Sequence, residues 1–283
     1  MIRQILLSLS SFPDRPPSQV LEGAATLAQL LGASLTAQIP QLSGDQKTWS
    51  PVIGAFPLDF PQLMNEAVLQ SERNATSVTE EIGKVCSGLR VPLDVRRSLA
   101  NLIDSPDCLV DLARLHDLTV LSHSQTDMLG GTVTEAVIFG TGRPTLLLPS
   151  GRGTKSLQWL DNVVVAWDYS REAARAMADA LPILARAKKV HVLSVLGEKG
   201  IHTTCALGDL DKYLTAHQVK YALDQVPLKD VAIGDRVMSY ASEVKADMLV
   251  MGAYGHSRFR EFVLGGATRG ALSNPTLPIF VSH

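Results

Sequence analysis

The chain carries one pattern of segments twice, and this repeat constrains the fold more than any other feature of the sequence. The two halves end alike, in Arg143-Pro144-Thr145-Leu146 and Asn274-Pro275-Thr276-Leu277. Each half opens with an apolar strand-like run, continues into a helix with apolar residues at helical spacing, and then reaches a second apolar run. The repeat indicates two copies of one folding unit.

Apolar runs and helical periodicity predict alternating strands and helices in both copies. Strands are expected at residues 5–8, 35–39, 118–121, 145–148, 163–166, 190–195, 248–251 and 276–281. Helices are expected near residues 20–31, 61–89, 104–116, 173–184, 207–217 and 235–245, and residues 41–61 are expected to run over the surface. Such alternation predicts an α/β fold with parallel sheets covered by helices on both faces.

Residues 149–156 are polar and contain glycines, so they are expected to link a domain at 1–150 to a second at 157–283.

The 283 residues carry a formal charge of −2 and 5% aromatic residues, which argues against a nucleic-acid partner. No apolar run approaches the roughly 20 residues of a membrane span, and residues 1–4 lack a signal layout. Three widely spaced cysteines do not suggest a disulfide framework. We expect a cytoplasmic protein.

A glycine-rich stretch follows the apolar run 248–251 and points to a ligand. It begins Met251-Gly252-Ala253-Tyr254-Gly255-His256 and continues to Gly265-Gly266-Ala267-Thr268, where a helix is expected to start. Glycines let a backbone approach an anion, and the free N–H groups of a helix start can bind phosphate. The alternative is that the glycines serve only a tight connection between strand and helix.

With these residues the chain resembles the universal stress protein family in a tandem, two-domain form. Gly252-x2-Gly255-x9-Gly265 carries the resemblance, together with Asp168-x-Ser170 after the first strand of the second half. The resemblance implies two open, parallel, five-stranded sheets of the Rossmann-like, adenine nucleotide alpha hydrolase-like type. It also implies a nucleotide at the carboxyl ends of the strands. That ligand would be ATP, AMP or ADP, with Mg²⁺, held for regulation in a stress response.

The resemblance also assigns roles to residues of the second half. Asp168 would contact the nucleoside, Val195 would line the adenine pocket, and Gly252 would lie by the ribose. Met251 is also expected among the nucleotide-binding residues. Six residues would approach the phosphates: Gly255, His256, Gly265, Gly266, Ala267 and Thr268. Gly266 departs from the family pattern, which has Ser or Thr there, so one hydroxyl ligand is missing.

The first half departs further from that pattern. Alignment on the shared Pro-Thr-Leu places Thr134-Glu135 opposite Gly265-Gly266, and a carboxylate there would repel phosphate. Ser10 stands roughly where Asp168 stands, and residues 122–125 lack the paired glycines. We expect a degenerate copy that keeps the fold without the nucleotide.

Several alternatives remain open on the sequence. Asp168 can be a turn residue before a helix cap at Ser170, and His256 a solvated loop histidine. Residues 202–205 with Asp209 and Asp211 have a ligand-like spacing, but no second such pair supports a metal site. We expect no catalytic residues, because residues 168–172 contain neither a glycine-serine phosphate loop nor paired histidines.

Three functions therefore compete: a nucleotide-binding regulator, a slow ATP hydrolase, and an interaction module without ligand. In the resembling family the last strands pair, so residues 145–148 and 276–281 are expected to join the halves into an intrachain pseudo-dimer. A homodimer is a further assembly that the sequence leaves open.

Overall fold

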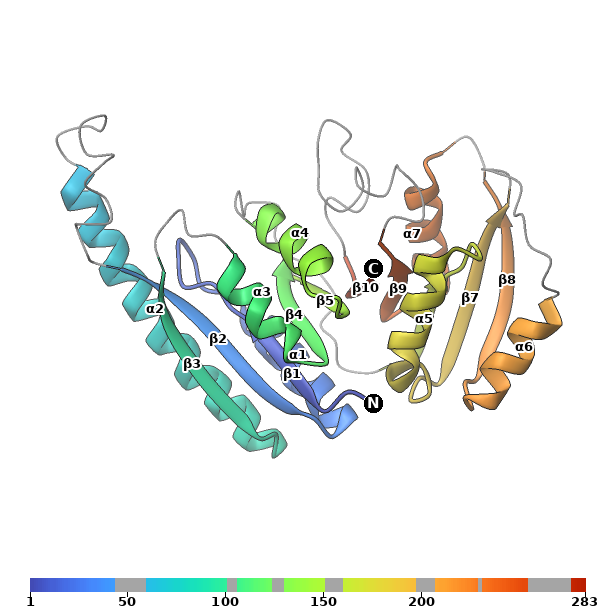
Figure 1. Cartoon of the computed structure of the whole chain (residues 1–283), viewed down its shortest axis with the longest axis horizontal. Helices are drawn as coiled ribbons and strands as arrows, with labels where there is room; N and C mark the ends of the chain where they lie inside the picture. Colours follow the sequence, from blue (N-terminus) through green and yellow to red (C-terminus); the bar gives the residue numbers. More distant parts are fainter. Residues whose placement is uncertain are drawn as a thin grey trace.

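In a computed structural model of the chain, the described residues are 1–43, 60–100, 106–123, 130–150, 160–196, 207–228, 231–253 and 276–283. The first half contains β1 (Gln4–Ser8), α1 (Ser18–Leu31), β2 (Ser34–Leu42), α2 (Phe60–Leu89), β3 (Leu93–Ala100), α3 (Asp107–Arg114), β4 (Leu118–His123), α4 (Gly130–Gly140) and β5 (Thr145–Pro149). The second half contains β6 (Asn162–Ala166), α5 (Arg171–Leu184), β7 (Lys189–Leu196), α6 (Leu207–Ala216), β8 (Tyr221–Pro227), α7 (Ile233–Glu243), β9 (Met248–Gly252) and β10 (Ile279–Ser282). Strands and helices alternate in both, as predicted (Figure 1).

The predicted elements are present with shifts at their ends. The last strand begins at Ile279 and not at Thr276, because Pro278 has no N–H to give to a ladder. The predicted helix 104–116 is shorter, α3 starting after Pro106. Most of the predicted surface stretch 41–61 lies outside the described residues.

The strands form one ten-stranded sheet in the order β3-β2-β1-β4-β5-β10-β9-β6-β7-β8. Within each half all neighbours are parallel, and the chain reverses its direction of travel across the sheet between β1 and β4, and again between β6 and β9. Each half is therefore an open doubly wound sheet with its own switch point.

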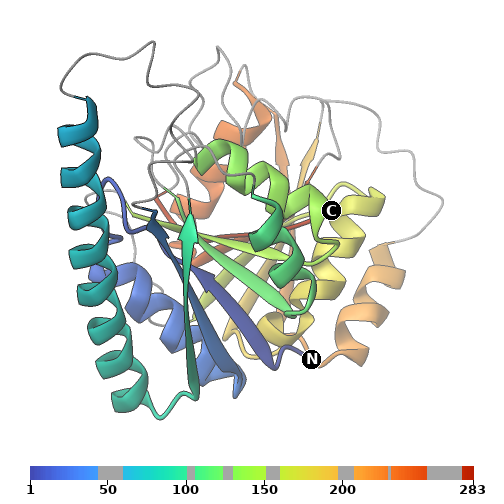
Figure 2. The ribbon, with the colours of Figure 1, turned by 60° about the vertical axis from the view of Figure 1, so that its left-hand side comes forward.

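Helices cover both faces of this sheet. The apolar residues of α1, α2, α5 and α6 pack into one core cluster on one face. Those of α3, α4 and α7 pack into a second cluster on the other face. Figure 2 shows α2 as a long helix beside β2 and β3 at the outer edge of the first half.

The two halves meet where β5 and β10 pair, which confirms the pairing of the last strands that the family resemblance implied, and the pairing is antiparallel. Ile279 lies opposite Leu147, Phe280 opposite Leu146 and Val281 opposite Thr145. Phe280 and Leu146 are both fully buried. Neither β5 nor β10 is therefore an edge strand that could pair with another chain.

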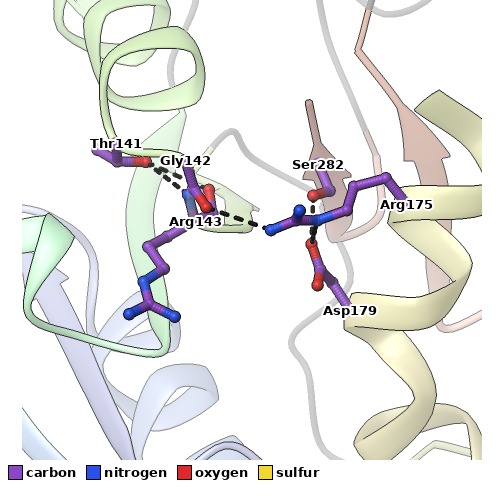
Figure 3. Close-up of polar contacts among 6 residues, drawn as sticks. All are labelled: Thr141, Gly142, Arg143, Arg175, Asp179 and Ser282. Carbon is purple, nitrogen blue, oxygen red and sulfur yellow. Dashed lines mark hydrogen bonds and ion pairs between the residues drawn. The ribbon is translucent and has the colours of Figure 1, made fainter. Parts of the chain in front are cut away.

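Polar contacts from α5 add to this joint (Figure 3). The Arg175 guanidinium donates to the carbonyl of Gly142 in the other half, with Nη2 and O 3.3 Å apart. The same guanidinium donates through Nε to Asp179 Oδ2 at 2.7 Å. The Ser282 hydroxyl of β10 donates to that oxygen at 2.6 Å. Gly142 has a φ of 64°, which suits a glycine in the turn between α4 and β5.

A buried polar cluster joins β7, β8 and α7. His191 Nδ1 lies 2.9 Å from Asp224 Oδ2 and 3.1 Å from the Tyr240 hydroxyl. Burial by itself would raise the pKa of Asp224, but hydrogen bonds from Tyr240 and His191 outweigh it and hold that pKa below its usual range. Burial, and then the neighbouring Asp224 carboxylate, raise the pKa of Tyr240.

These shifts predict a stability that falls at both ends of the pH range. The depressed pKa of Asp224 stabilises the fold above about pH 4, and this contribution is lost as pH falls through the folded-state value. The raised pKa of Tyr240 stabilises the fold below about pH 10, and this contribution is lost as pH rises. Urea midpoints measured from pH 2 to 11 should therefore fall at acid pH, the acid limb of the curve, and again at alkaline pH, the alkaline limb.

Two variants separate the limbs. Asp224→Asn should make the urea midpoint depend less on pH in the acid limb. Tyr240→Phe should do the same in the alkaline limb. The matched control is Asp94→Asn on β3, whose ion pair with Arg96 is exposed at both side chains (58% and 53%) and contributes little. An acid limb unchanged by Asp224→Asn would contradict the assignment.

Candidate functional site

The turn after β6 holds the predicted ligand residue Asp168. Its Oδ1 accepts a hydrogen bond from the Ser170 backbone N–H at 2.9 Å. Ser170 then caps α5, because its hydroxyl oxygen accepts from the Ala173 N–H at 3.1 Å. The interpretation of Asp168 as a turn residue before a cap at Ser170 is thus confirmed. A contact between Asp168 and a ligand remains a prediction.

Three further predicted residues lie at the carboxyl ends of strands next to this turn. Val195 is near the end of β7, and Met251 and Gly252 end β9. Both strands are direct neighbours of β6 in the sheet. Val195 and Met251 pack into the cluster under α7, while Gly252 faces α5. The fold therefore brings Asp168, Val195, Met251 and Gly252 to one end of three adjacent strands.

The other predicted phosphate-binding residues lie outside the described part of the chain. They are Gly255, His256, Gly265, Gly266, Ala267 and Thr268. Residues 202–205, which the sequence analysis considered as part of a metal site, also lie outside the described residues. Of its two acidic members, Asp209 pairs with Lys212 at 3.3 Å and Asp211 accepts from the Tyr221 hydroxyl.

Gly252 is a position of very close approach between β9 and the start of α5. A Cβ built there would lie 2.4 Å from the Glu172 carbonyl carbon and 2.7 Å from the Ala173 nitrogen. These are backbone atoms, so no side-chain rotation relieves the clash. Packing against α5 is sufficient to require glycine here, whatever else the residue contacts.

The sequence did not single out the residues that hold this turn in place. The Trp167 backbone N–H donates to the Leu193 carbonyl at 2.8 Å, and the Ser194 hydroxyl donates to the Trp167 backbone carbonyl at 2.9 Å. Ser194 is 6% exposed. One signal was available, since a serine inside the apolar run of β7 is a buried hydroxyl that must find an acceptor.

In the first half the corresponding loop after β1 is occupied by side chains of α2. The Ser11 and Ser71 hydroxyls lie 2.6 Å apart, and both residues are buried. The Asn74 amide donates to the Ser11 carbonyl at 2.9 Å, and the Gln70 amide donates to the Pro13 carbonyl at 2.7 Å. Ser10, which stands where Asp168 stands, donates to the Asp14 carbonyl at 3.0 Å.

Thr134 and Glu135 lie inside α4, with Thr134 3% exposed and Glu135 partly buried.

Across the described ranges, no group of three or more His, Cys, Asp or Glu side chains is arranged to hold a metal ion. No helix within these ranges is long and apolar enough to cross a bilayer.

The close approach at Gly252 gives a stability prediction. Gly252→Ala should destabilise the protein by about 1–3 kcal/mol, the usual cost of forcing atoms into packed structure. The matched control is Gly83→Ala in the middle of α2, where a Cβ meets nothing within 4 Å. That change should stabilise the protein by about 0.5–1 kcal/mol, because alanine favours helix. Urea unfolding measures both, and a neutral Gly252→Ala would contradict the clash.

Known proteins resemble the chain in sequence and in fold. The model of the Universal stress protein family matches residues 160–283. A universal stress protein from Synechocystis sp. strain PCC 6803 is 26% identical over 180 residues. That alignment covers 61% of this chain, and the chain spans only 60% of the length of that relative.

Solved structures share the fold over nearly the whole chain. A universal stress protein from Archaeoglobus fulgidus superposes with a TM-score of 0.68 at 13% identity, over 98% of this chain and 95% of that one. A functionally unknown protein from Pseudomonas aeruginosa PAO1 superposes with a TM-score of 0.53 at 14% identity, over 99% and 92%. These likenesses concern the fold, and the family match lies in the C-terminal half. Residues 160–283 therefore match the universal stress protein family, and nearly the whole chain shares the fold of a solved universal stress protein.

Proposed function

We propose that the C-terminal half binds an adenine nucleotide, ATP or AMP, as a regulatory ligand in a stress response. The observation that carries this is the convergence of the Asp168 turn and Gly252 at the switch point between β6 and β9. Open α/β sheets bind ligands at such a point, beyond the carboxyl ends of their strands.

The sequence around this point supplies the groups that a nucleotide needs. The chain leaves Gly252 into the segment with Gly255, Gly265 and Gly266, whose backbone N–H groups suit phosphate oxygens. Val195 and Met251 offer apolar surface for a base next to the Asp168 carboxylate, which can accept from ribose hydroxyls. The match of residues 160–283 to the universal stress protein family supports the same ligand.

We further propose that the first half binds no nucleotide. Its loop after β1 is held by Ser71, Asn74 and Gln70 of α2 through the hydrogen bonds described above. Glu135 also brings negative charge to the position that matches Gly266. The first half is then a structural and interaction partner of the second, in an intrachain pseudo-dimer.

Titration calorimetry with ATP and AMP tests the ligand and its stoichiometry together. We expect one nucleotide per chain, and mass spectrometry of nucleotide released from the purified protein should find the same compound.

Gly265→Glu should weaken binding at least about tenfold, because it places a carboxylate near phosphate. The matched control Glu135→Gln in the first half should change nothing. No binding at millimolar ATP would contradict the proposal, and two nucleotides per chain would contradict its restriction to one half.

Two substitutions of Asp168 separate its turn role from its ligand role. Asp168→Asn keeps a side-chain oxygen for the Ser170 N–H, so stability should stay nearly constant while nucleotide affinity falls. Asp168→Ala should lower both. Equal affinity for wild type and Asp168→Asn would leave the residue with its turn role only.

Repeating the ATP titrations with Mg²⁺ and with EDTA shows whether the metal contributes to binding. If the protein hydrolyses ATP and substitution of Asp168 abolishes the turnover, the function as a slow ATP hydrolase is favoured.

A further inference from the structure

Tyr169 adopts a backbone conformation that its side chain disfavours. Its φ is 60°, in the left-handed region, where a bulky residue costs on the order of 1 kcal/mol or more. Three other non-glycine residues of the described chain share this conformation: Arg90, Gln218 and Lys245. Each of those follows a helix, where left-handed residues commonly end the last turn. Tyr169 instead precedes a helix, so helix termination does not explain it.

The surrounding hydrogen bonds impose this conformation. Trp167 is fixed on one side by the Leu193 carbonyl and the Ser194 hydroxyl. Ser170 is fixed on the other side by Asp168 and by its own role as the cap of α5. Tyr169 lies between these anchors, so its side chain has a set direction while its backbone is strained. Smaller or more tolerant residues such as Gly or Asn would fit the turn at lower cost.

The Tyr169 ring rests on the ring of Trp167. The ring centroids are 5.3 Å apart with an interplanar angle of 63°, an edge-to-face contact. Trp167 packs in turn against the core under α5. Its indole Nε1 is buried and has no hydrogen-bond acceptor among the residues that the structure describes, although a buried tryptophan usually finds one. Trp167 is therefore held at this point for its ring and not for its N–H.

This aromatic pair flanks the carboxylate proposed to contact the nucleoside. Asp168 lies between the two rings in sequence, in the turn after β6, and β6 is the sheet neighbour of β9, which ends at Gly252. Aromatic residues are only 5% of the chain, yet two of them occupy this three-residue stretch. Tyr169 is partly exposed, so its ring is available to a ligand while Trp167 supports it from the core side.

We propose that Tyr169, supported by Trp167, stacks on the base of the bound nucleotide and makes the site select an aromatic base over a ribose phosphate alone. The proposal rests on the proposed function of the C-terminal half. It explains why a strained tyrosine stands in a turn that a glycine would complete without strain. Base–aromatic stacking contributes to affinity with little dependence on the identity of the base.

Calorimetry on the full chain tests the stacking residue with two matched variants. Tyr169→Asn suits the left-handed turn and lacks the ring, so it should fold at least as stably as wild type by thermal unfolding. Its affinity for AMP should fall about five- to a hundredfold, the range that base stacking supplies. Tyr169→Phe keeps the ring and should bind AMP within about twofold of wild type.

The ligand series separates this inference from the proposed function. Ribose 5-phosphate, which has no base, should bind wild type and Tyr169→Asn with equal affinity, and more weakly than AMP binds wild type. If wild type binds AMP and Tyr169→Asn binds it equally well, stacking is overturned and nucleotide binding stands. If wild type binds neither AMP nor ATP at millimolar concentration, the proposed function is overturned and the stacking role with it. Tyr169→Gly repeats the test should Tyr169→Asn fail to fold.

Discussion

The antiparallel pairing of β5 with β10 is the contact on which the rest of this structure depends. Each half is an open parallel sheet whose last strand would otherwise present unpaired backbone groups at an edge. Pairing places both strands at the centre of one sheet and buries Phe280 against its register partner Leu146. This shared burial requires apolar residues in the last strand of each half.

Helix α5 connects this joint to the candidate site. Its first turn begins at Ser170, directly after Asp168, and receives Gly252 at backbone contact distance. Further along the same helix, Arg175 and Asp179 bind the turn after α4 and the hydroxyl of Ser282. Helix α5 thus both joins the Asp168 turn through the cap at Ser170 and contacts the first half.

Local pattern was a good guide to the elements of this fold. The apolar strands and the helices α1 and α5 were predicted, because the apolar residues of a buried face recur at regular spacing in the sequence. The sequence did not locate β3 and β8, which mix apolar with polar residues and lie partly or fully exposed at the two edges of the sheet. In the site, Asp168 and Ser170 were predicted, but the left-handed Tyr169 was not, because nothing in Asp-Tyr-Ser indicates a positive φ.

By itself the sequence determined the duplicated α/β fold, and it predicts which half accepts a phosphate. Both follow from residue chemistry at fixed spacing: apolar runs, glycines, and the carboxylate of Glu135. The pairing of the last strands was implied by the family resemblance, and the structure confirms it. Only the tertiary structure decided that Gly252 must lack a side chain, and that α2 occupies the loop after β1. It also decided that Trp167 supports Tyr169. Such relations depend on how closely packed elements approach one another, and spacing along a chain does not encode that distance.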